Sequence, residues 1–203
     1  DQMFRPTLVE TKDYKANGDG SSFIKTEYNG AGQAVFTSLP STNANNTIGT
    51  TTTYDGLGRV TGTSENTTLA PTTTTTYLSN HRIRTTDPLG NQTTTWFDGY
   101  GGPGKGDVLL IEQPEDVSTQ IYRNNWGQID KVRQSGFGDD GAYKMEEHNY
   151  YYDSQYRLCR QFTQSGRGVV YQYNDAGEVI AYNKGKGLGY MCDTPAGTSL
   201  VNL

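Results

Sequence analysis

The first stretch whose residue types and spacing would support chemistry is glycine-rich. The residues GYGGPGK, from Gly99 to Lys105, match the G-x-x-x-x-G-K pattern of a phosphate-binding loop. Such a loop needs Ser or Thr as its next residue, to bind a metal ion, and a helix after it. Here Gly106 follows, and the residues DVLLIEQP after it are typical of a strand. The pattern therefore indicates a flexible hairpin connection.

Two acidic stretches are similar to fragments of a calcium loop. NGDGSS begins at Asn17 and GDDG begins at Gly138. A calcium site needs several oxygen ligands at regular spacing, and the first stretch offers only Asn17, Asp19 and, further off, Asp13. Both stretches are interpreted as polar turns, and we expect no metal and no cofactor.

Catalytic side chains are scarce. His81 and His148 each stand alone, away from any nucleophile motif. Glu146 and Glu147 are adjacent, so on a strand they would face opposite sides, and we interpret them as part of a solvated loop. Spacing alone does not exclude a carboxylate pair for glycoside hydrolysis, because such partners meet only in three dimensions. We expect no catalytic residue and no enzyme activity.

Cys159 and Cys192 are the only cysteines. They would form one disulfide or remain as two buried thiols, and the sequence does not choose between these states. A metal site would need more ligands than two cysteines and two distant histidines supply.

The composition indicates which elements position these residues. Only 33% of the 203 residues are hydrophobic, yet the chain holds 15 Tyr and 25 Gly. Tyr and Thr favour strands and Gly favours turns. We expect an all-β protein with many tight turns and a thin core.

Charge and hydrophobicity exclude some partners. The net charge is -5, and no Lys/Arg cluster is long enough to follow a phosphate backbone, so nucleic acid is not expected. No apolar run approaches the roughly 18 residues that span a bilayer. The chain opens on DQMFRPT, without an initiator Met or a signal peptide, and we expect a fragment of a longer protein.

Internal repeats are the strongest signal. Six similar units share an Asp or Asn that is followed three residues later by Gly, and a Tyr-Asp pair marks a seventh. Asp or Asn starts a turn by bonding its own backbone, and Gly takes the positive-φ position. The predicted turn residues, with the tyrosines before them, are Tyr28, Asn29, Gly32, Tyr54, Asp55, Gly58, Asp87, Gly90, Asp98, Gly101, Asn124, Gly127, Tyr152, Asp153, Tyr173, Asn174 and Gly177.

Strand-forming segments follow the turns, so each unit is predicted to be a β-hairpin. We expect repeated antiparallel hairpins that stack into a curved, solenoid-like ribbon. Residues 1–203 are treated as a single region, with recognisable repeats over about 23–182 and less regular ends at 1–22 and 183–203.

These units resemble the YD repeats of the Rhs family. The resemblance rests on TTTYDGLGRVTGT, TDPLGNQTTTWFDGYG, NNWGQIDKVRQSG, YYDSQYRLC and YQYNDAGEVIAY, and it covers most of the chain. The family includes bacterial Rhs and wall-associated toxins, the B and C components of insecticidal toxin complexes, and the teneurins. The resemblance implies a wall segment of a shell that encloses and helps to deliver a C-terminal toxin, secreted or at the cell surface of a bacterium.

The chain departs from the full family pattern. Its length corresponds to only part of such a shell, and we expect no toxin domain within these residues. DPLGN at Asp87 is superficially similar to the family's autocleavage signature, but Asn91 stands where Leu is expected, so we interpret it as a repeat turn. The implied partners are the rest of the shell polypeptide and its toxin cargo.

A binding module is the alternative function. The tyrosines, with Trp96 and Trp126, would form a platform for a cell-surface glycan or protein, since aromatic faces stack on sugars. Their regular place before turns favours packing between hairpins instead. Open sheet edges also make an edge-to-edge dimer of the isolated fragment plausible.

Overall fold

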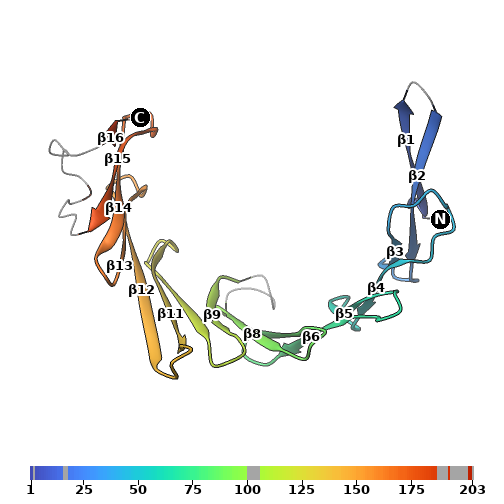
Figure 1. The fold of residues 1–203 in the computed structure, drawn as a ribbon, viewed down its shortest axis with the longest axis horizontal. Helices are drawn as coiled ribbons and strands as arrows, with labels where there is room; N and C mark the ends of the chain where they lie inside the picture. Colours follow the sequence, from blue (N-terminus) through green and yellow to red (C-terminus); the bar gives the residue numbers. More distant parts are fainter. Residues whose placement is uncertain (2, 16–17, 100–105, 187–191, 193–200, 203) are drawn as a thin grey trace. The chain divides into compact units, whose positions relative to one another are not determined.

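The computed structural model is built from strands. It describes residues 1, 3–15, 18–99, 106–186, 192 and 201–202, and within these residues it contains 16 strands and no helix (Figure 1). Their bounds are β1 Leu8–Lys15, β2 Gly18–Tyr28, β3 Ala34–Ser38, β4 Gly49–Tyr54, β5 Val60–Glu65, β6 Thr72–Leu78, β7 Arg82–Thr86, β8 Gln92–Phe97, β9 Val108–Glu112, β10 Ser118–Arg123, β11 Ile129–Phe137, β12 Tyr143–Tyr152, β13 Leu158–Thr163, β14 Arg167–Tyr173, β15 Val179–Lys186 and β16 Val201–Asn202. The predicted all-β class is confirmed.

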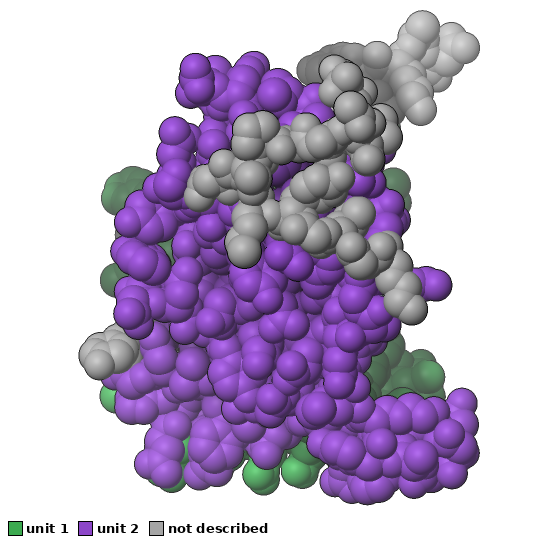
Figure 2. All heavy atoms as spheres, turned by 90° about the vertical axis from the view of Figure 1, so that its left-hand side faces the viewer, with its two compact units in different colours: residues 1–79, 83–93 green, residues 80–82, 94–203 purple. Residues whose placement is uncertain are grey.

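The chain divides into two compact units, residues 1–79 with 83–93, and residues 80–82 with 94–203 (Figure 2). Within each unit the strand order follows the chain order. Every strand pair for which the register is defined is antiparallel, as in β4 with β5 and β14 with β15. Repeated antiparallel hairpins are thus present as predicted, and the curvature of the ribbon stays a prediction.

The buried core is thin. Among the described residues, the buried hydrophobic side chains are Cys159, Phe162, Val170 and Ala181, all on β13 to β15. Along the Thr-rich β6, exposed and half-buried residues alternate. Cross-strand pairs of Thr and aromatic side chains therefore supply much of the sheet's stability.

Gly168 shows how closely the backbone packs in this region. It is paired with Phe162 across β13 and β14. A Cβ atom added at Gly168 would clash with the Gln161 carbonyl and would lie 2.7 Å from the Phe162 ring. Gly168 thus lets the Phe162 ring pack directly on the backbone of β14, where any side chain would clash with it. The Arg160 guanidinium lies over the same ring, 4.2 Å from its centre.

Two tight connections were missed by the sequence interpretation. Asn80 and His81 both have positive φ, at 60° and 55°, and Glu115 and Asp116 have 61° and 56°. Consecutive positive φ values define a type I′ turn, the common two-residue connection of a hairpin. His81, considered above as a lone histidine, therefore has a backbone role in a turn.

The segment around Glu146 and Glu147 also differs from expectation. Strand β12 begins at Tyr143 and includes both residues, so they do not lie in a loop. Glu147 accepts a hydrogen bond of 2.8 Å from Arg133 on β11. Glu146 lies on the opposite face of the strand from Glu147. Its Oε1 atom is 3.7 Å from Nε2 of His148. The two carboxylates consequently do not converge on one site.

Candidate functional site in the repeat turns

The turn at Asp55 shows how the sequence closes a hairpin. Its first residue, Asp55, donates its N–H to the Arg59 carbonyl, and the fourth residue, Gly58, donates to the Asp55 carbonyl. The Asp55 Oδ1 atom accepts the N–H groups of Leu57 and Arg59 at 2.9 and 3.0 Å. Gly58 has φ of +80°, which L-residues resist. The result is a five-residue turn with a bulge, and the fifth residue is Arg59.

The same arrangement, called a repeat turn below, occurs in both units. In each case Oδ1 of the first residue accepts the N–H of the fifth, and the N–H of the fourth bonds the carbonyl of the first. The further repeat turns are Asp1–Arg5, Asn29–Gln33, Asp87–Asn91, Asn124–Gln128, Asp153–Arg157 and Asn174–Glu178. One hydrogen-bonding scheme therefore recurs at seven turns of the described chain.

The repeat turn at Asp1 was not predicted, because its fourth residue is Phe4 rather than Gly. Phe4 has φ of 59° and is fully exposed. Tyr156 is a second exception, with φ of 62°. Such non-glycine residues pay roughly 1–2 kcal/mol for the left-handed conformation. The signal that would have found the Asp1 turn is an Asp followed four residues later by Arg, as at Asp55.

The prediction of a short turn at Asp98 and Gly101 is wrong. Asp98 donates its N–H to the Asp107 carbonyl, and its Oδ1 atom accepts the Asp107 N–H at 3.1 Å. Phe97 on β8 pairs with Val108 on β9. These bonds show that the connection closes at Asp107 rather than four residues after Asp98. Gly101 and most of GYGGPGK lie outside the described residues.

The first and fifth residues of every repeat turn are matched as acceptor and donor. Where the first residue is Asp, the fifth donates to its carboxylate: Arg5, Arg59, Asn91 and Arg157. Where the first residue is Asn, its Nδ2 donates to an oxygen of the fifth: Gln33, Gln128 and Glu178. This pairing orients the fifth side chain. In Gln33 and Gln128 the amide oxygen is held by the first residue, so the Nε2 group points away from the turn.

The tyrosines before the turns link one hairpin to the preceding one. The Tyr54 hydroxyl donates to the Ala34 carbonyl at 2.8 Å, and Ala34 directly follows the preceding repeat turn. Tyr152 donates to Ile129 at 2.7 Å and Tyr173 to Leu158 at 2.7 Å, with the same placement. In the same way, the Tyr28 hydroxyl donates to the Pro6 carbonyl at 3.1 Å. Every link is made to the residue directly after a repeat turn.

The fifth residues make a second set of links in the opposite direction. Gln33 Nε2 donates to the Gly58 carbonyl at 3.1 Å, and Gln128 Nε2 donates to the Tyr156 carbonyl at 2.7 Å. Arg157 Nη1 donates to the Asn174 carbonyl at 3.1 Å, and its guanidinium lies 4.6 Å from the centre of the Tyr173 ring. Three pairs of consecutive turns, those beginning at 29 and 55, at 124 and 153, and at 153 and 174, are thus joined both by a tyrosine and by the side chain of the fifth residue.

These contacts shift the pKa values of the turn carboxyls. The Arg59 N–H and then its guanidinium lower the pKa of Asp55, and the Asn91 amide lowers that of Asp87. At Asp153 burial raises the pKa, but the N–H and guanidinium of Arg157 outweigh it, so the pKa is lowered. Burial raises the pKa of Tyr152 and Tyr173, so their hydroxyls stay protonated and able to donate.

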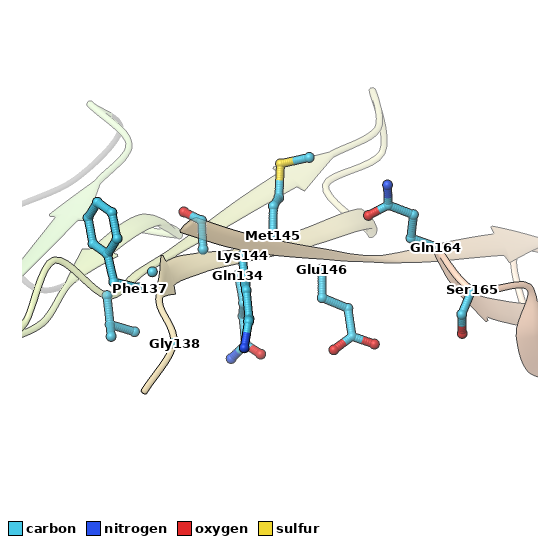
Figure 3. A pocket seen from close by; sticks show the side chains of 11 residues that line it. Gln134, Phe137, Gly138, Lys144, Met145, Glu146, Gln164 and Ser165 are labelled. Atoms are coloured by element: carbon cyan, nitrogen blue, oxygen red, sulfur yellow. The ribbon is translucent and has the colours of Figure 1, made fainter. Parts of the chain in front are cut away.

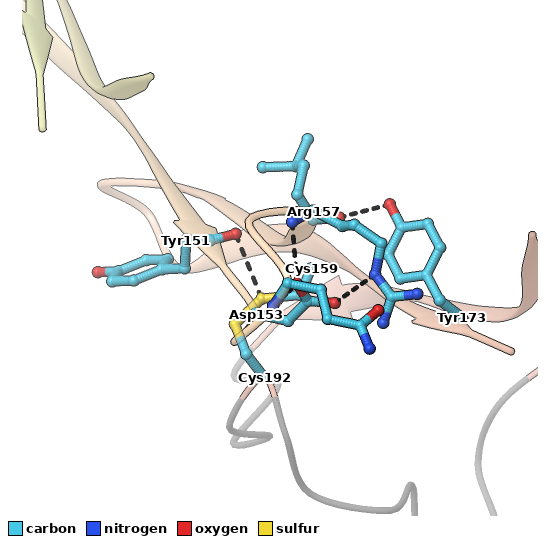
Figure 4. The surroundings of a disulfide bond; sticks show 8 residues. Tyr151, Asp153, Arg157, Cys159, Tyr173 and Cys192 are labelled. Atoms are coloured by element: carbon cyan, nitrogen blue, oxygen red, sulfur yellow. Dashed lines mark hydrogen bonds and ion pairs between the residues drawn. A yellow bond between two sulfur atoms is a disulfide. The ribbon is translucent and has the colours of Figure 1, made fainter. Parts of the chain in front are cut away.

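A disulfide joins Cys159 to Cys192, with 5.5 Å between their Cα atoms (Figure 4). Cys159 is 1% exposed, and its Sγ atom lies 3.2 Å from the Tyr151 carbonyl. The bridge lies beside the Asp153 repeat turn and its Arg157 (Figure 4). Of the two states that the sequence left open, the structure contains the disulfide.

One groove, of about 780 Å³, lies along β11 and β12. Its Gln134, Lys144 and Glu146 side chains project to one side, whereas Phe137 and Met145 project to the other (Figure 3). Among the described residues, no group of three His, Cys, Asp or Glu side chains could hold a metal ion.

Of the two stretches that are similar to calcium loops, one is partly outside the described residues and the other forms a turn with its own hydrogen bonds. Asn17 is outside the described residues. GDDG forms a turn in which Gly138 bonds the Ala142 carbonyl, and Asp140 pairs with Lys144. Nothing in this turn gathers several oxygens toward one point.

A smaller groove, about 480 Å³, is aromatic. Trp126 and Tyr156 come from consecutive repeat turns, and their ring centroids lie 5.2 Å apart. Trp126 is 67% exposed and Tyr156 is 53% exposed. By contrast, Trp96 donates its indole N–H to Glu112 and lies under Arg82. Of the two tryptophans considered for a sugar platform, only Trp126 presents its ring in this way.

No protein-family model and no curated protein matches the chain. A crystal structure of TcdB2-TccC3-Cdc42 is similar at 12% identity and TM-score 0.23, over 88% of this chain and 15% of that chain. TcdB2-TccC3-TEV is similar at 12% identity and TM-score 0.21, over 87% and 14%. A Photorhabdus luminescens Tc holotoxin pore is similar at 11% identity and TM-score 0.22, over 96% and 15%. The chain thus spans about one seventh of the length of these neighbours.

Within the residues described, no helix has the length and apolar character needed to cross a membrane.

Proposed function

We propose that this chain is a structural segment of a bacterial Rhs/YD-repeat shell, which encloses a C-terminal toxin and helps to deliver it. The observation that supports the proposal is the double linkage of consecutive repeat turns. Tyr54, Tyr152 and Tyr173 each reach back to the preceding hairpin, and Gln33, Gln128 and Arg157 reach forward. Their sequence context is the YD-repeat pattern itself.

The physical argument concerns how a wall is held together without a deep core. Few side chains are fully buried, so apolar burial alone gives limited cohesion. Each hairpin is instead fixed to its neighbour by the strand ladder and by side-chain links at the turn. In this proposal the chain is not an enzyme, acts outside the producing cell, and has the remaining shell and the toxin as partners.

The test uses the full reading frame that encodes this chain. Tyr54, Tyr152 and Tyr173 are changed together to Phe, and protease cleavage of the C-terminal cargo is measured, with toxicity to the producing cell. We expect faster cleavage and greater self-toxicity, because the wall opens more often. A triple variant of exposed Leu57, Leu89 and Val9, each changed to Ala, serves as the control. Equal protection of the cargo in both triple variants contradicts the proposal.

The aromatic groove favours a second function, a module that binds a cell-surface glycan. Trp126 and Tyr156 expose large ring faces, and rings of this kind pack on the apolar face of a sugar. Asp130 and Tyr151 line the same groove, and both are exposed and available for hydrogen bonds to hydroxyls. A glycan array on the purified chain tests this function. Binding that Trp126→Ala removes and Trp96→Ala keeps would support it, and no binding at high protein concentration excludes it.

A further inference from the structure

The side-chain amide of Asn29, the first residue of its repeat turn, is held in a reactive arrangement. Its Oδ1 atom accepts the N–H groups of Ala31 and Gln33, both at 3.0 Å. Two N–H donors on a carbonyl oxygen draw electron density from the carbon, and they stabilise the negative charge that develops on the oxygen during nucleophilic attack. The Cγ atom of Asn29 is therefore an activated electrophile.

The backbone nitrogen next to this amide belongs to Gly30. Within the described residues, the Gly30 N–H donates no hydrogen bond to another protein group. The residue is exposed, and a Cβ atom built on it would have nothing within 4 Å. Glycine also reaches backbone conformations that other residues resist, which helps a ring to close through its nitrogen. A nucleophile that nothing crowds thus directly follows the activated amide.

Two further repeat turns begin with Asn, at Asn124 and Asn174. In both, Oδ1 accepts the N–H of the fifth residue, as it does at Asn29. The following residue is Asn125 in one and Asp175 in the other, and each carries a side chain beside its nitrogen. Among the Asn repeat turns of the described chain, only the one at Asn29 joins the activated amide to a glycine.

We infer that Asn29 is a site of deamidation, with water as the co-reactant. The Gly30 nitrogen forms a bond to Cγ of Asn29 and gives its proton to solvent. The bond from Cγ to Nδ2 breaks, and Nδ2 takes up a proton and leaves as ammonia. Water opens the resulting succinimide ring at either carbonyl, which yields aspartate or isoaspartate. This reaction goes beyond the proposed function and does not depend on a toxin cargo.

The product of this reaction alters a link between two repeat turns. Asn29 Nδ2 donates to Gln33 Oε1 at 2.8 Å, and Gln33 Nε2 donates to the Gly58 carbonyl at 3.1 Å. A carboxylate at position 29 has no N–H, so Gln33 must turn Nε2 toward it and release Gly58. The Tyr54 hydroxyl keeps its bond to Ala34. Deamidation therefore removes one of the two links between these turns, which both lie in the first unit.

The experiment incubates the purified chain at mildly alkaline pH, because base removes the Gly30 proton. Trypsin digestion and tandem mass spectrometry follow the exchange of NH₂ for OH at each Asn. Asn29 falls in peptide 26–59, and Asn17, which also precedes a glycine, falls in peptide 16–25, so the two are measured separately. We expect Asn29 to be lost at least about tenfold faster than Asn124, which is about 1.4 kcal/mol in activation free energy.

Two variants test the assignment in opposite directions. Gly30→Ala keeps the bonds of the Asn29 amide and adds a methyl group in open space, at a residue whose φ is not positive. Its melting temperature should stay the same, and deamidation should slow by about tenfold. Asn125→Gly supplies a glycine after Asn124 and should raise the rate there by a similar factor. The same incubation in guanidinium chloride gives the rates of the unfolded chain, and the Asn29 rate in the folded protein should not be lower.

The consequence for the link is tested with Asn29→Asp, which reproduces one product. It should lower the melting temperature by roughly 2–4 °C, the shift of about one hydrogen bond at this chain length. On a Gln33→Ala background, where the bond to Gly58 is already absent, the same substitution should have a much smaller effect. An undiminished effect on that background would show that the lost link is not the cause.

The inference is overturned if folded Asn29 reacts no faster than Asn124 or more slowly than in the unfolded chain. An unchanged rate in Gly30→Ala, at an unchanged melting temperature, also overturns it. These rates are measured on the chain alone, so a failure of cargo protection would reject the proposed function and leave the deamidation site standing.

Discussion

The Tyr152 hydroxyl donates a 2.7 Å hydrogen bond to the Ile129 carbonyl, and the two residues are 23 positions apart in the chain. Ile129 directly follows the Asn124 repeat turn, and Tyr152 directly precedes the Asp153 repeat turn. The bond therefore joins two consecutive turns by one side-chain atom. Similar bonds recur at Tyr54 and Tyr173, so its strength can be measured and compared along the chain.

Tyr152→Phe removes only this hydroxyl. We expect a loss of about 1 kcal/mol in the free energy of unfolding, because the Ile129 carbonyl remains half-buried without its donor. Chemical denaturation followed by circular dichroism measures the loss. Tyr151→Phe is the matched control, since its ring is 47% exposed and keeps its contact with Arg160. An equal effect of the two substitutions would refute the role of the link.

Gly58→Ala tests the backbone conformation of the repeat turn. Gly58 has φ of +80°, so a Cβ atom there strains the turn, and we expect a destabilisation of about 1 kcal/mol. Gly56→Ala in the same turn is the control, since nothing lies within 4 Å of an added Cβ and its φ is not positive. Comparable melting temperatures for the two variants would show that the turn tolerates a side chain at its fourth residue.

Phe4→Gly should stabilise the protein, in contrast to Gly58→Ala. Phe4 is fully exposed and holds φ of 59°, so replacing it by Gly relieves strain without removing a packed ring. We expect the Asp1 repeat turn to gain roughly 0.5–1 kcal/mol. Hydrogen exchange of the Arg5 amide, which donates to Asp1 Oδ1, reports the local gain. Faster exchange in the variant would mean that Phe4 stabilises the turn.

The matching of first and fifth residues predicts a compensating pair of substitutions. In Asn124→Asp, Gln128 must turn its Nε2 toward the new carboxylate, and it then loses its bond to the Tyr156 carbonyl. We expect a loss of about 1 kcal/mol. Adding Gln128→Arg reproduces the pair found at Asp153 and Arg157, which makes both bonds. A double-mutant cycle should show favourable coupling, and simple additivity would disprove the matching rule.

The lowered pKa of Asp55 gives a pH dependence with a defined sign. The folded state favours the carboxylate, so its contribution to stability is complete above the unfolded pKa and is lost as pH falls through the lower folded pKa. NMR titration of the Asp55 carboxyl should give a midpoint below 3.8. In Arg59→Met the midpoint should rise only part of the way, because the backbone N–H bond remains. A midpoint that Arg59→Met does not change would exclude the guanidinium as a cause.

Much of the turn architecture could be predicted from sequence because it is local. Asn29, Asp55, Asp87, Asn124 and Asn174 are each followed three residues later by Gly, and the structure gives all of them the same turn. The Asp1 turn and the turns at Asn80–His81 and Glu115–Asp116 escaped, because non-glycine residues hold positive φ there. Asp98 was misassigned, since the same spacing occurs inside a longer connection that closes at Asp107.

The links between turns could not be predicted, because they depend on the register of strands far apart in the chain. Nothing adjacent to Tyr54 indicates that its hydroxyl meets Ala34, 20 residues away. That contact depends on the bulge after Gln33, which shifts the pairing of β2 and β3 by one residue at Tyr28. The sequence did not decide whether the disulfide forms for a similar reason, since the two cysteines are 33 residues apart in the chain.

The agreement of strand order with chain order has a mechanical consequence. If the two ends of the first unit, residues 1–79 with 83–93, are pulled apart, the outermost strand bears the force first, and its hydrogen bonds break one after another. The hairpins inside it stay intact until they become the outermost ones, because each is linked only to its immediate neighbours. A unit of this kind lengthens stepwise from its ends under tension. Each step recovers independently when the tension is released, so the ribbon can be drawn out as a thread and can refold in order.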